Sequence, residues 1–301
     1  MLEKSCELII GVDQILVVKP NNSGIDSDNF PSFNNFCPFT DGGNDQKCSS
    51  YAELISSTFI TLLQYLKTVN YGKENLGNEK FVQYCILWLC YKLNQQTENG
   101  ISNLNDFQNN YINGIEEHIV KSASADGYNI YKNFIDKKHD STSIDIKEMS
   151  KLYEALKILC NMYTECNKKS KNYTNCLQDA KNFAKNFENL NQDYSITGNS
   201  SYREILSSLS TDYNNFKSNC GGKCNCNDIP TLSKIKTPQN PVQISEATSS
   251  NSSIASKLIP GLLTFAIPIF LGVAYKYSLF GFGKRSQKQY LREKLKNQRR
   301  K

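Results

Sequence analysis

Apolar residues recur every three or four positions along residues 50–220, a pattern that predicts a succession of amphipathic helices. Ser50 and Glu53 form a capping-box sequence in front of the first helix, and Ser201 and Glu204 form another in front of the last. The apolar stripes are Ile55, Phe59, Leu62 and Leu66; Leu104, Phe107, Tyr111, Ile115 and Ile119; Met149, Leu152, Leu156, Leu159 and Tyr163; Leu177, Ala180, Phe183, Phe187 and Leu190; and Ile205, Leu209, Tyr213 and Phe216.

Residues 81–93 (FVQYCILWLCYKL) differ from these stripes because they are apolar almost all round. A helix of that kind is buried on every side, so we expect it at the centre of the domain. Trp88 is then a core residue rather than part of a ligand pocket. No comparable strand alternation competes with the helical stripes, so the sequence predicts an all-α domain of about six helices.

Residues 258–275 (LIPGLLTFAIPIFLGVAY) form an uncharged, mostly apolar run. About 18 or more such residues are long enough to cross a hydrocarbon core as a helix. Lys276 can extend its charged end to the interface, so the predicted span covers residues 257–282. We name Lys257, Lys276, Lys284 and Arg285 as its flanking residues. Because a Lys/Arg-rich flank marks the cytoplasmic side, residues 283–301 are predicted to be a cytoplasmic tail, with the N-terminal domain outside or in a lumen.

Between the helices and the predicted span, residues 227–256 carry prolines and the sequence SEATSSNSS. They bury too little apolar surface to fold alone and predict a flexible stalk. The helical domain is then residues 1–226, with an irregular loop at residues 21–48 that is rich in Asn, Ser, Asp and Gly. Residues 1–20 make a poor signal peptide, because Glu7 and Asp13 interrupt a short apolar stretch. Membrane targeting would fall to the C-terminal helix or to an internal signal.

The net charge of +6 hides an asymmetry along the chain. Residues 258–301 carry ten Lys/Arg and one Glu, a charge of +9, so the difference leaves −3 for the first 257 residues. The large domain therefore lacks the basic face that nucleic-acid binding requires, and we expect no nucleic-acid partner. The basic tail is predicted to contact anionic lipid headgroups.

All 11 cysteines precede the predicted span, which favours an oxidising compartment for the domain and a reducing one for the tail. An odd count leaves at least one thiol free or paired between chains. Cys37 and Cys48 bracket part of the irregular loop and could close it. Cys220, Cys224 and Cys226 form the densest cluster, and their candidate disulfide partners are Cys160, Cys166 and Cys176. Buried reduced thiols are the alternative.

Catalytic chemistry has little support in the sequence. Zinc at Cys220, Cys224 and Cys226 would need a fourth ligand in a recognisable spacing, and both histidines, His118 and His139, are far away along the chain. No phosphate loop, HExxH or GxSxG motif occurs. We therefore predict no enzyme activity, no cofactor and no metal. N-x-S/T sequons, which matter if the chain enters a glycosylating compartment, lie at Asn21, Asn172, Asn199 and Asn251.

Several segments resemble the Plasmodium interspersed repeat (PIR) proteins of the rodent-parasite yir/bir/cir branch. They are FVQYCILWLCYKLNQQTENGISNLNDF, LYEALKILCNMYTECNKKSKNYTNCL, STDYNNFKSNC, and the C-terminal block from SKLIP through AYKYSLFGFGKRSQKQYLREKLKNQRRK. The resemblance runs from Cys6 to Lys301, and its C-terminal block is highly specific. Cys85 and Cys90 are extra cysteines relative to that pattern.

The resemblance implies a variant antigen of malaria-infected cells, with a disulfide-stabilised helical ectodomain, a stalk and one membrane helix. It implies residence at infected-erythrocyte or parasite membranes and a role in antigenic variation, immune evasion or host-cell adhesion, without catalytic residues. A host receptor or an antibody is the corresponding candidate partner. The alternative hypothesis is a trafficking or membrane-remodelling component of internal parasite or host-cell membranes.

Overall fold

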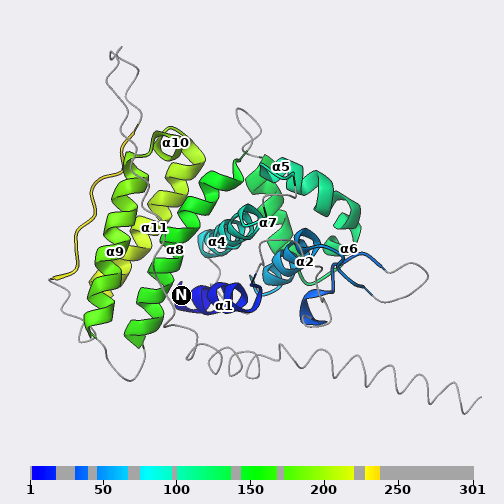
Figure 1. Ribbon diagram of the computed structural model, residues 1–301, viewed down its shortest axis with the longest axis horizontal. Helices are drawn as coiled ribbons and strands as arrows, with labels where there is room; N and C mark the ends of the chain where they lie inside the picture. The colour runs from blue at the N-terminus through cyan, green and yellow to red at the C-terminus, as the bar shows by residue number, and fades with distance from the viewer. Residues whose placement is uncertain are drawn as a thin grey trace, which may run out of the picture. The chain divides into compact units, whose positions relative to one another are not determined.

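In the computed structural model, the described residues are 2–17, 31–39, 46–66, 75–96, 100–136, 144–167, 173–219 and 228–237. The chain divides into two compact units, residues 1–238 and residues 239–301, and all of the described residues belong to the first. That unit is all-α (Figure 1). Its described residues contain isolated β-bridges at Phe39–Gln46 and Asn103–Asp145 and no longer strand.

The helical elements follow one another along the chain, with part of their connections outside the described residues. In order they are α1 (Leu2–Ile15), the 3₁₀ turn η2 (Pro31–Phe33), α2 (Tyr51–Leu63), α4 (Asn75–Asn94), α5 (Leu104–Phe107), the π-helix η3 (Gln108–Ile112), the 3₁₀ turn η4 (Asn113–Ile115), α6 (Glu116–Val120), α7 (Ala125–Asp136), α8 (Ile146–Asn167), α9 (Tyr173–Gln192), α10 (Tyr194–Thr197) and α11 (Ser200–Asn219).

Helix α4 is the central helix that residues 81–93 predict. Contacts with α1, α2, α7 and α8 surround it. Its side chains are buried on every face, including Phe81, Trp88 and Leu93. Burying a large apolar side chain contributes about 1.5–3 kcal/mol relative to leaving it exposed, so the burial of α4 stabilises the fold strongly.

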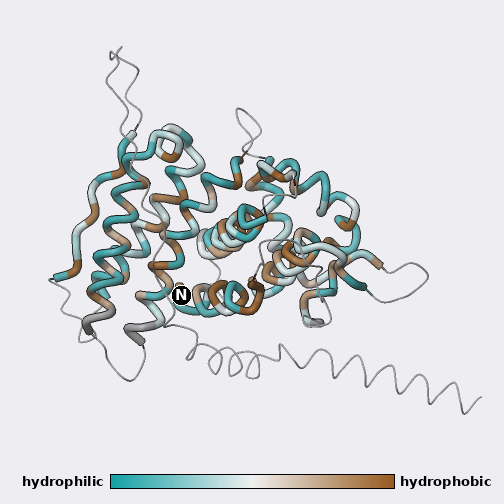
Figure 2. The backbone as a smooth tube through the Cα atoms, viewed as in Figure 1, coloured by the Kyte–Doolittle hydropathy of each residue, from teal (hydrophilic) through white to brown (hydrophobic). Residues whose placement is uncertain are grey.

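Helices α8, α9 and α11 form a layer beside this centre, with α8 in contact with both α4 and α9 (Figure 1). Each buries most of the stripe predicted for it, while Tyr163 and Leu177 are half-buried. On α9, Ala180, Phe183 and Phe187 are fully buried. Hydrophilic residues occupy much of the rest of α9 (Figure 2). This division between one apolar stripe and a polar remainder is what a helix at the edge of a core requires.

Helix α1 was not among the predicted helices, yet Leu2, Cys6, Ile9 and Val12 bury one of its faces. Its C-terminal end is held by Lys92 of α4, which is 3% exposed. The Lys92 ammonium donates to the carbonyls of Asp13 and Leu16 at 3.0 and 2.7 Å and lies 2.7 Å from the Asp13 carboxylate. A cation at this position compensates the partial negative charge of the last helical carbonyls.

Helix α7 is the second helix that the periodicity did not predict. It buries Tyr128, Tyr131 and Ile135 against the core. Gly127 brings α7 close to α2, because a Cβ added there would lie 2.8 Å from the Cβ of Leu63 and 2.9 Å from its carbonyl oxygen. A single glycine at a helix crossing carries no signal in the apolar pattern.

The stripe from Leu104 to Ile119 predicted one continuous helix, and this prediction was wrong. The backbone there runs through α5, the π-helix η3, the 3₁₀ turn η4 and α6. A π turn inserts one extra residue into the helical register. As a result Ile112 is fully buried, whereas Tyr111 is half-buried.

The first predicted capping box is confirmed with a small change, and the second is wrong. Ser50 Oγ accepts from the Glu53 amide at 3.2 Å, but the Glu53 carboxylate accepts from the amide of Ser49 rather than that of Ser50. At α11 the cap is Asn199, whose Oδ1 accepts from the amide of Ser201 at 2.8 Å. Asn is as good an N-cap as Ser, and with Asn199 as the cap the helix begins two residues earlier than predicted.

Residues 228–237, which we call the strap, were assigned to the flexible stalk, and that assignment was wrong for this segment. Ile229 of the strap is 2% exposed. Tyr213 donates to the carbonyl of Pro230 at 2.8 Å. Asn191 of α9 donates to the carbonyl of Lys234 and accepts from the amide of Lys236, at 2.9 and 2.8 Å. These bonds to distant helices give the strap the partners that its own composition lacks.

Candidate functional site

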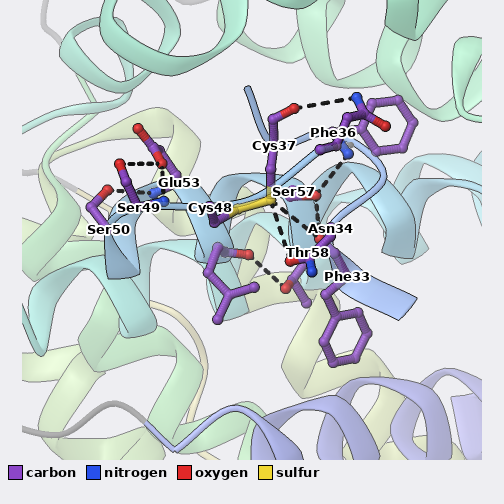
Figure 3. Close-up of a disulfide and its surroundings, with 12 residues drawn as sticks. Phe33, Asn34, Phe36, Cys37, Cys48, Ser49, Ser50, Glu53, Ser57 and Thr58 are labelled. Atoms are coloured by element: carbon purple, nitrogen blue, oxygen red, sulfur yellow. Dashed lines mark hydrogen bonds between the residues drawn. A yellow bond between two sulfur atoms is a disulfide. The ribbon is translucent and has the colours of Figure 1, made fainter. Parts of the chain in front are cut away.

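The loop bounded by Cys37 and Cys48 is a surface feature whose two ends are held in place by several interactions. These cysteines form a disulfide across 11 positions of sequence, with a Cα–Cα distance of 4.8 Å (Figure 3). Inside it, Phe39 and Gln46 form an antiparallel bridge, and the Lys47 amide donates to the carbonyl of Pro38 at 3.1 Å. The two ends of residues 40–45 are therefore held by a covalent bond and by backbone hydrogen bonds.

Helix α2 anchors this loop by hydrogen bonds from the side chain of Ser57, which is fully buried. The Ser57 hydroxyl accepts from the amide of Phe36 at 3.0 Å and donates to the carbonyl of Phe33 (Figure 3). Phe33, Phe36 and both cysteines are buried beneath the loop. The segment before Cys37 is thus anchored in the core by its aromatic side chains and by one hydroxyl.

The N-terminus of α2 supports the other side of the disulfide. Glu53 accepts from both the amide and the hydroxyl of Ser49, at 2.6 and 2.8 Å, next to Cys48 (Figure 3). A carboxylate in the first turn also interacts favourably with the helix dipole. Cys48 is therefore fixed by the beginning of a helix rather than by a flexible connection.

Phe39 is the large apolar residue that the Cys37–Cys48 loop exposes to solvent. Its side chain is 65% exposed, one of few large apolar side chains in the described residues that are so exposed. Phe36, three positions earlier, points to α6 instead and packs against the His118 ring at 5.2 Å between centroids. Aromatic side chains on a rigid support are the residues that most often dominate binding energy in protein interfaces.

Cys160, predicted as a partner of the Cys220, Cys224 and Cys226 cluster, is instead bonded to Cys6 of α1. The Cα–Cα distance is 5.1 Å, and the two residues are 154 positions apart. The prediction failed because it did not recognise α1, whose buried face lies against α8. A helical stripe of Leu2, Cys6 and Ile9 was the available signal.

The remaining cysteines fall into three groups. Cys176 is disulfide-bonded, whereas the side chain of Cys166 and residues Cys220, Cys224 and Cys226 lie outside the described part of the structure. Cys85 and Cys90 are free thiols inside α4. Burial raises the pKa of both thiols well above the ordinary value, so they remain protonated and unreactive.

The histidines, which were not predicted to form a site, can be located only in part. His118 is an exposed residue of α6, and His139 lies outside the described residues. Among the described residues, no group of three His, Cys, Asp or Glu side chains could hold a metal ion. The predicted flanking residues Lys257, Lys276, Lys284 and Arg285 lie outside the described residues, as does the apolar run 258–275. Within the described helices, none combines the length and apolar character that a membrane crossing needs.

Comparisons with known proteins agree with this architecture. The chain is similar to a solved structure described as a Plasmodium PIR protein ectodomain, with 27% identity and a TM-score of 0.54. The match covers 79% of this chain and 100% of that chain. No curated protein matches. A family model described as Plasmodium variant antigen protein Cir/Yir/Bir matches residues 6–276, nearly the whole chain and all of its described helices except the first residues of α1. The chain therefore belongs to the Plasmodium Cir/Yir/Bir family of variant antigens.

Proposed function

We propose that this protein is a single-pass surface antigen of malaria-infected cells whose helical domain is exposed to antibodies and host receptors. The observation that carries the proposal is the family match over residues 6–276. The match begins at Cys6, in the disulfide that joins α1 to α8, and ends at the Lys276 that interrupts the apolar run. One family model thus covers nearly all of the folded domain and most of the predicted anchor, residues 257–282.

The disulfides support an extracytoplasmic position for the domain. Cys6–Cys160 and Cys37–Cys48 are formed, and Cys176 is bonded as well. Disulfides of this kind persist in oxidising compartments and are rare in a reducing cytosol. The basic tail, which carries no cysteine, fits the opposite side of the membrane.

The construction of the Cys37–Cys48 loop supports a role in antigenic variation. Its ends are held by the disulfide, the Phe39–Gln46 bridge and Ser57, none of which depends on the side chains of residues 40–45 (TDGGND). Loops on a rigid scaffold tolerate substitution better than the elements they connect. Sequence change at these positions can therefore alter the surface while leaving the helical core in place.

The strap also fits a membrane-anchored domain. It returns along α9 and α11, so the chain leaves the domain at a defined place, beside Asn191 (Figure 1). In this proposal the stalk is limited to residues 238–256, which lie outside the described residues.

Protease shaving of intact infected cells tests the proposal. A tag placed in the C-terminal tail and an antibody against the 50–220 domain are followed separately before and after protease treatment. We expect the domain to be lost while the tail stays protected, and permeabilised cells to lose both. Protection of the domain in intact cells would overturn the proposal and favour a component of an internal membrane.

A further inference from the structure

Asn199 lies in the connection between α10 and α11 and begins the sequence Asn-Ser-Ser, an N-x-S/T motif. The motifs at Asn21, Asn172 and Asn251 lie outside the described residues. Asn199 is therefore the asparagine of this kind whose surroundings the structure describes. What the side chain contacts decides whether the folded domain can carry a sugar at this position.

The side-chain oxygen of Asn199 caps helix α11. Its Oδ1 accepts from the amide of Ser201 at 2.8 Å and from the amide of Tyr202 at 3.4 Å. Because backbone amides only donate, they hold the oxygen toward the helix and turn the planar amide group so that Nδ2 faces away from it. Within the described residues Nδ2 donates no hydrogen bond, and the side chain is half-buried.

This division of labour makes capping compatible with modification. A substituent on Nδ2 replaces one of its two hydrogens and leaves the oxygen as a hydrogen-bond acceptor. The cap, whose loss would cost about 0.5–2 kcal/mol, is then retained. Asn199 can therefore carry a sugar and still begin α11.

The ring of Tyr194 lies beside this asparagine. Tyr194 begins α10 and is 77% exposed, more than the other large hydrophobic side chains in the described residues. A Cβ added at Gly198 would lie 3.2 and 3.3 Å from Cε1 and Cζ of that ring, so the ring covers the backbone next to Asn199. Its exposed surface is a flat apolar face of the size that a sugar ring can cover with its C–H groups.

We propose that Asn199 carries an N-linked glycan whose first N-acetylglucosamine packs on Tyr194. The sugar donor is a lipid-linked diphosphate sugar, and the catalyst is a glycosyltransferase of the secretory lumen. Nδ2 forms a bond to C1 of the sugar, while the bond from C1 to the diphosphate oxygen breaks. The lipid diphosphate leaves with the electron pair, and one Nδ2 proton passes to a base of the transferase. The inference rests on the proposed function, because it requires the domain to enter that lumen.

The test uses the full chain behind a cleavable signal peptide, expressed in cultured mammalian cells. The signal peptide delivers the domain to the lumen whatever its natural targeting is. Glycosylation can therefore fail while protease shaving of infected cells succeeds, and the reverse also holds. Peptide-N-glycosidase converts a glycosylated Asn into Asp, so mass spectrometry of the peptide containing Asn199 detects the modification. We expect most molecules to be modified at this residue.

Two variants remove the glycan and keep the cap. Asn199→Asp retains the oxygen that accepts from the α11 amides but has no Nδ2. Ser201→Ala retains the amide that donates to Asn199 but lacks the hydroxyl that the motif requires. Both should lose the modification, with the helix content by circular dichroism unchanged. Ser200→Ala, at the exposed middle position of the motif, is the matched control and should be modified like the wild type.

The contact with Tyr194 has a readout of its own, measured on chains purified in lipid nanodiscs after the glycan is trimmed to its first sugar. The glycosylated wild type should melt about 2 °C above Asn199→Asp, and this difference should vanish when both chains carry Tyr194→Ser. A parallel chain with Gly42→Asn and Asn44→Thr places a reporter motif in the Cys37–Cys48 loop. The proposal is overturned if the reporter is modified and Asn199 is not, or if the melting difference is absent or survives Tyr194→Ser.

Discussion

The disulfides Cys6–Cys160 and Cys37–Cys48 differ in the elements that they connect and in their effect on the stability of the fold. The first joins helices whose cysteines are 154 positions apart and lies within the core, while the second closes 11 positions of a surface loop. In the chain-entropy model, stabilisation grows with the length of the closed loop. The comparison teaches that one disulfide stabilises the fold and the other holds a surface in shape.

The largest effect is expected from removing the long-range disulfide. The double variant Cys6→Ser and Cys160→Ser should lose about 5 kcal/mol of unfolding free energy in the chain-entropy model, less whatever structure the unfolded state retains. Denaturant unfolding monitored by circular dichroism measures this loss. An unchanged midpoint would mean that the contacts of α1 with α8 hold the two helices together without the disulfide. It would contradict the larger stabilising role assigned to Cys6–Cys160.

The next effect concerns Lys92, which holds the other end of α1. Lys92→Met removes a buried cation from Asp13 and from two helix-end carbonyls, and should destabilise the fold by about 3–5 kcal/mol. Asp13→Asn combined with Lys92→Met is the control. It removes the carboxylate that Lys92→Met leaves without a counter-charge, and should recover part of the lost unfolding free energy. A single variant as stable as the wild type would contradict the role given to this pair.

The same variant gives a pH test with a definite sign. Burial lowers the pKa of Lys92 below its ordinary value of 10.5. Between the lowered pKa and 10.5, the unfolded chain holds the proton that the folded chain releases, so the unfolding free energy of the wild type rises with pH relative to Lys92→Met. The difference between the two proteins should be constant at lower pH. A difference that falls over this window would contradict the burial of the charge.

A smaller loss is expected from the surface disulfide. Cys37→Ser with Cys48→Ser should cost about 3 kcal/mol or less, because the closed loop is short. Amide hydrogen exchange should increase at residues 31–39 and 46–50 and stay unchanged in α4 and α8, since the change is local. Faster exchange throughout the core would show that the loop and the core are one cooperative unit.

The sequence predicted the parts of this molecule that depend on near neighbours. The stripes of α8, α9 and α11 and the all-round apolar character of 81–93 were enough to place those helices, because burial imposes a helical period. The capping role of Ser50 and the possible closure of the Cys37 loop were also visible, because each involves residues close together in the chain.

What the sequence did not predict depends on distant partners. The strap is held by Asn191 of α9 and Tyr213 of α11. The composition of residues 228–237 gives no sign of these distant hydrogen-bond partners. Cys6 becomes a partner of Cys160 only once α1 packs on α8. The π-helix η3 shifts the helical register by one residue, whereas the periodicity over residues 104–119 predicts a straight helix.

The smallest effect on stability, and the sharpest test of the comparison, comes from Phe39. Because its side chain is 65% exposed, Phe39→Ser should change the unfolding free energy by no more than about 0.5 kcal/mol. Antibodies are raised against the folded protein, and those that fail to bind the Cys37→Ser and Cys48→Ser variant are selected. We expect these antibodies to bind Phe39→Ser at least tenfold more weakly, about 1.4 kcal/mol, because the loop presents this ring as its main apolar contact. Tyr194→Ser, at the exposed α10, is the matched control and should bind normally. Equal binding to both variants would mean that the surface disulfide shapes an epitope elsewhere in the loop and that Phe39 is not its anchor.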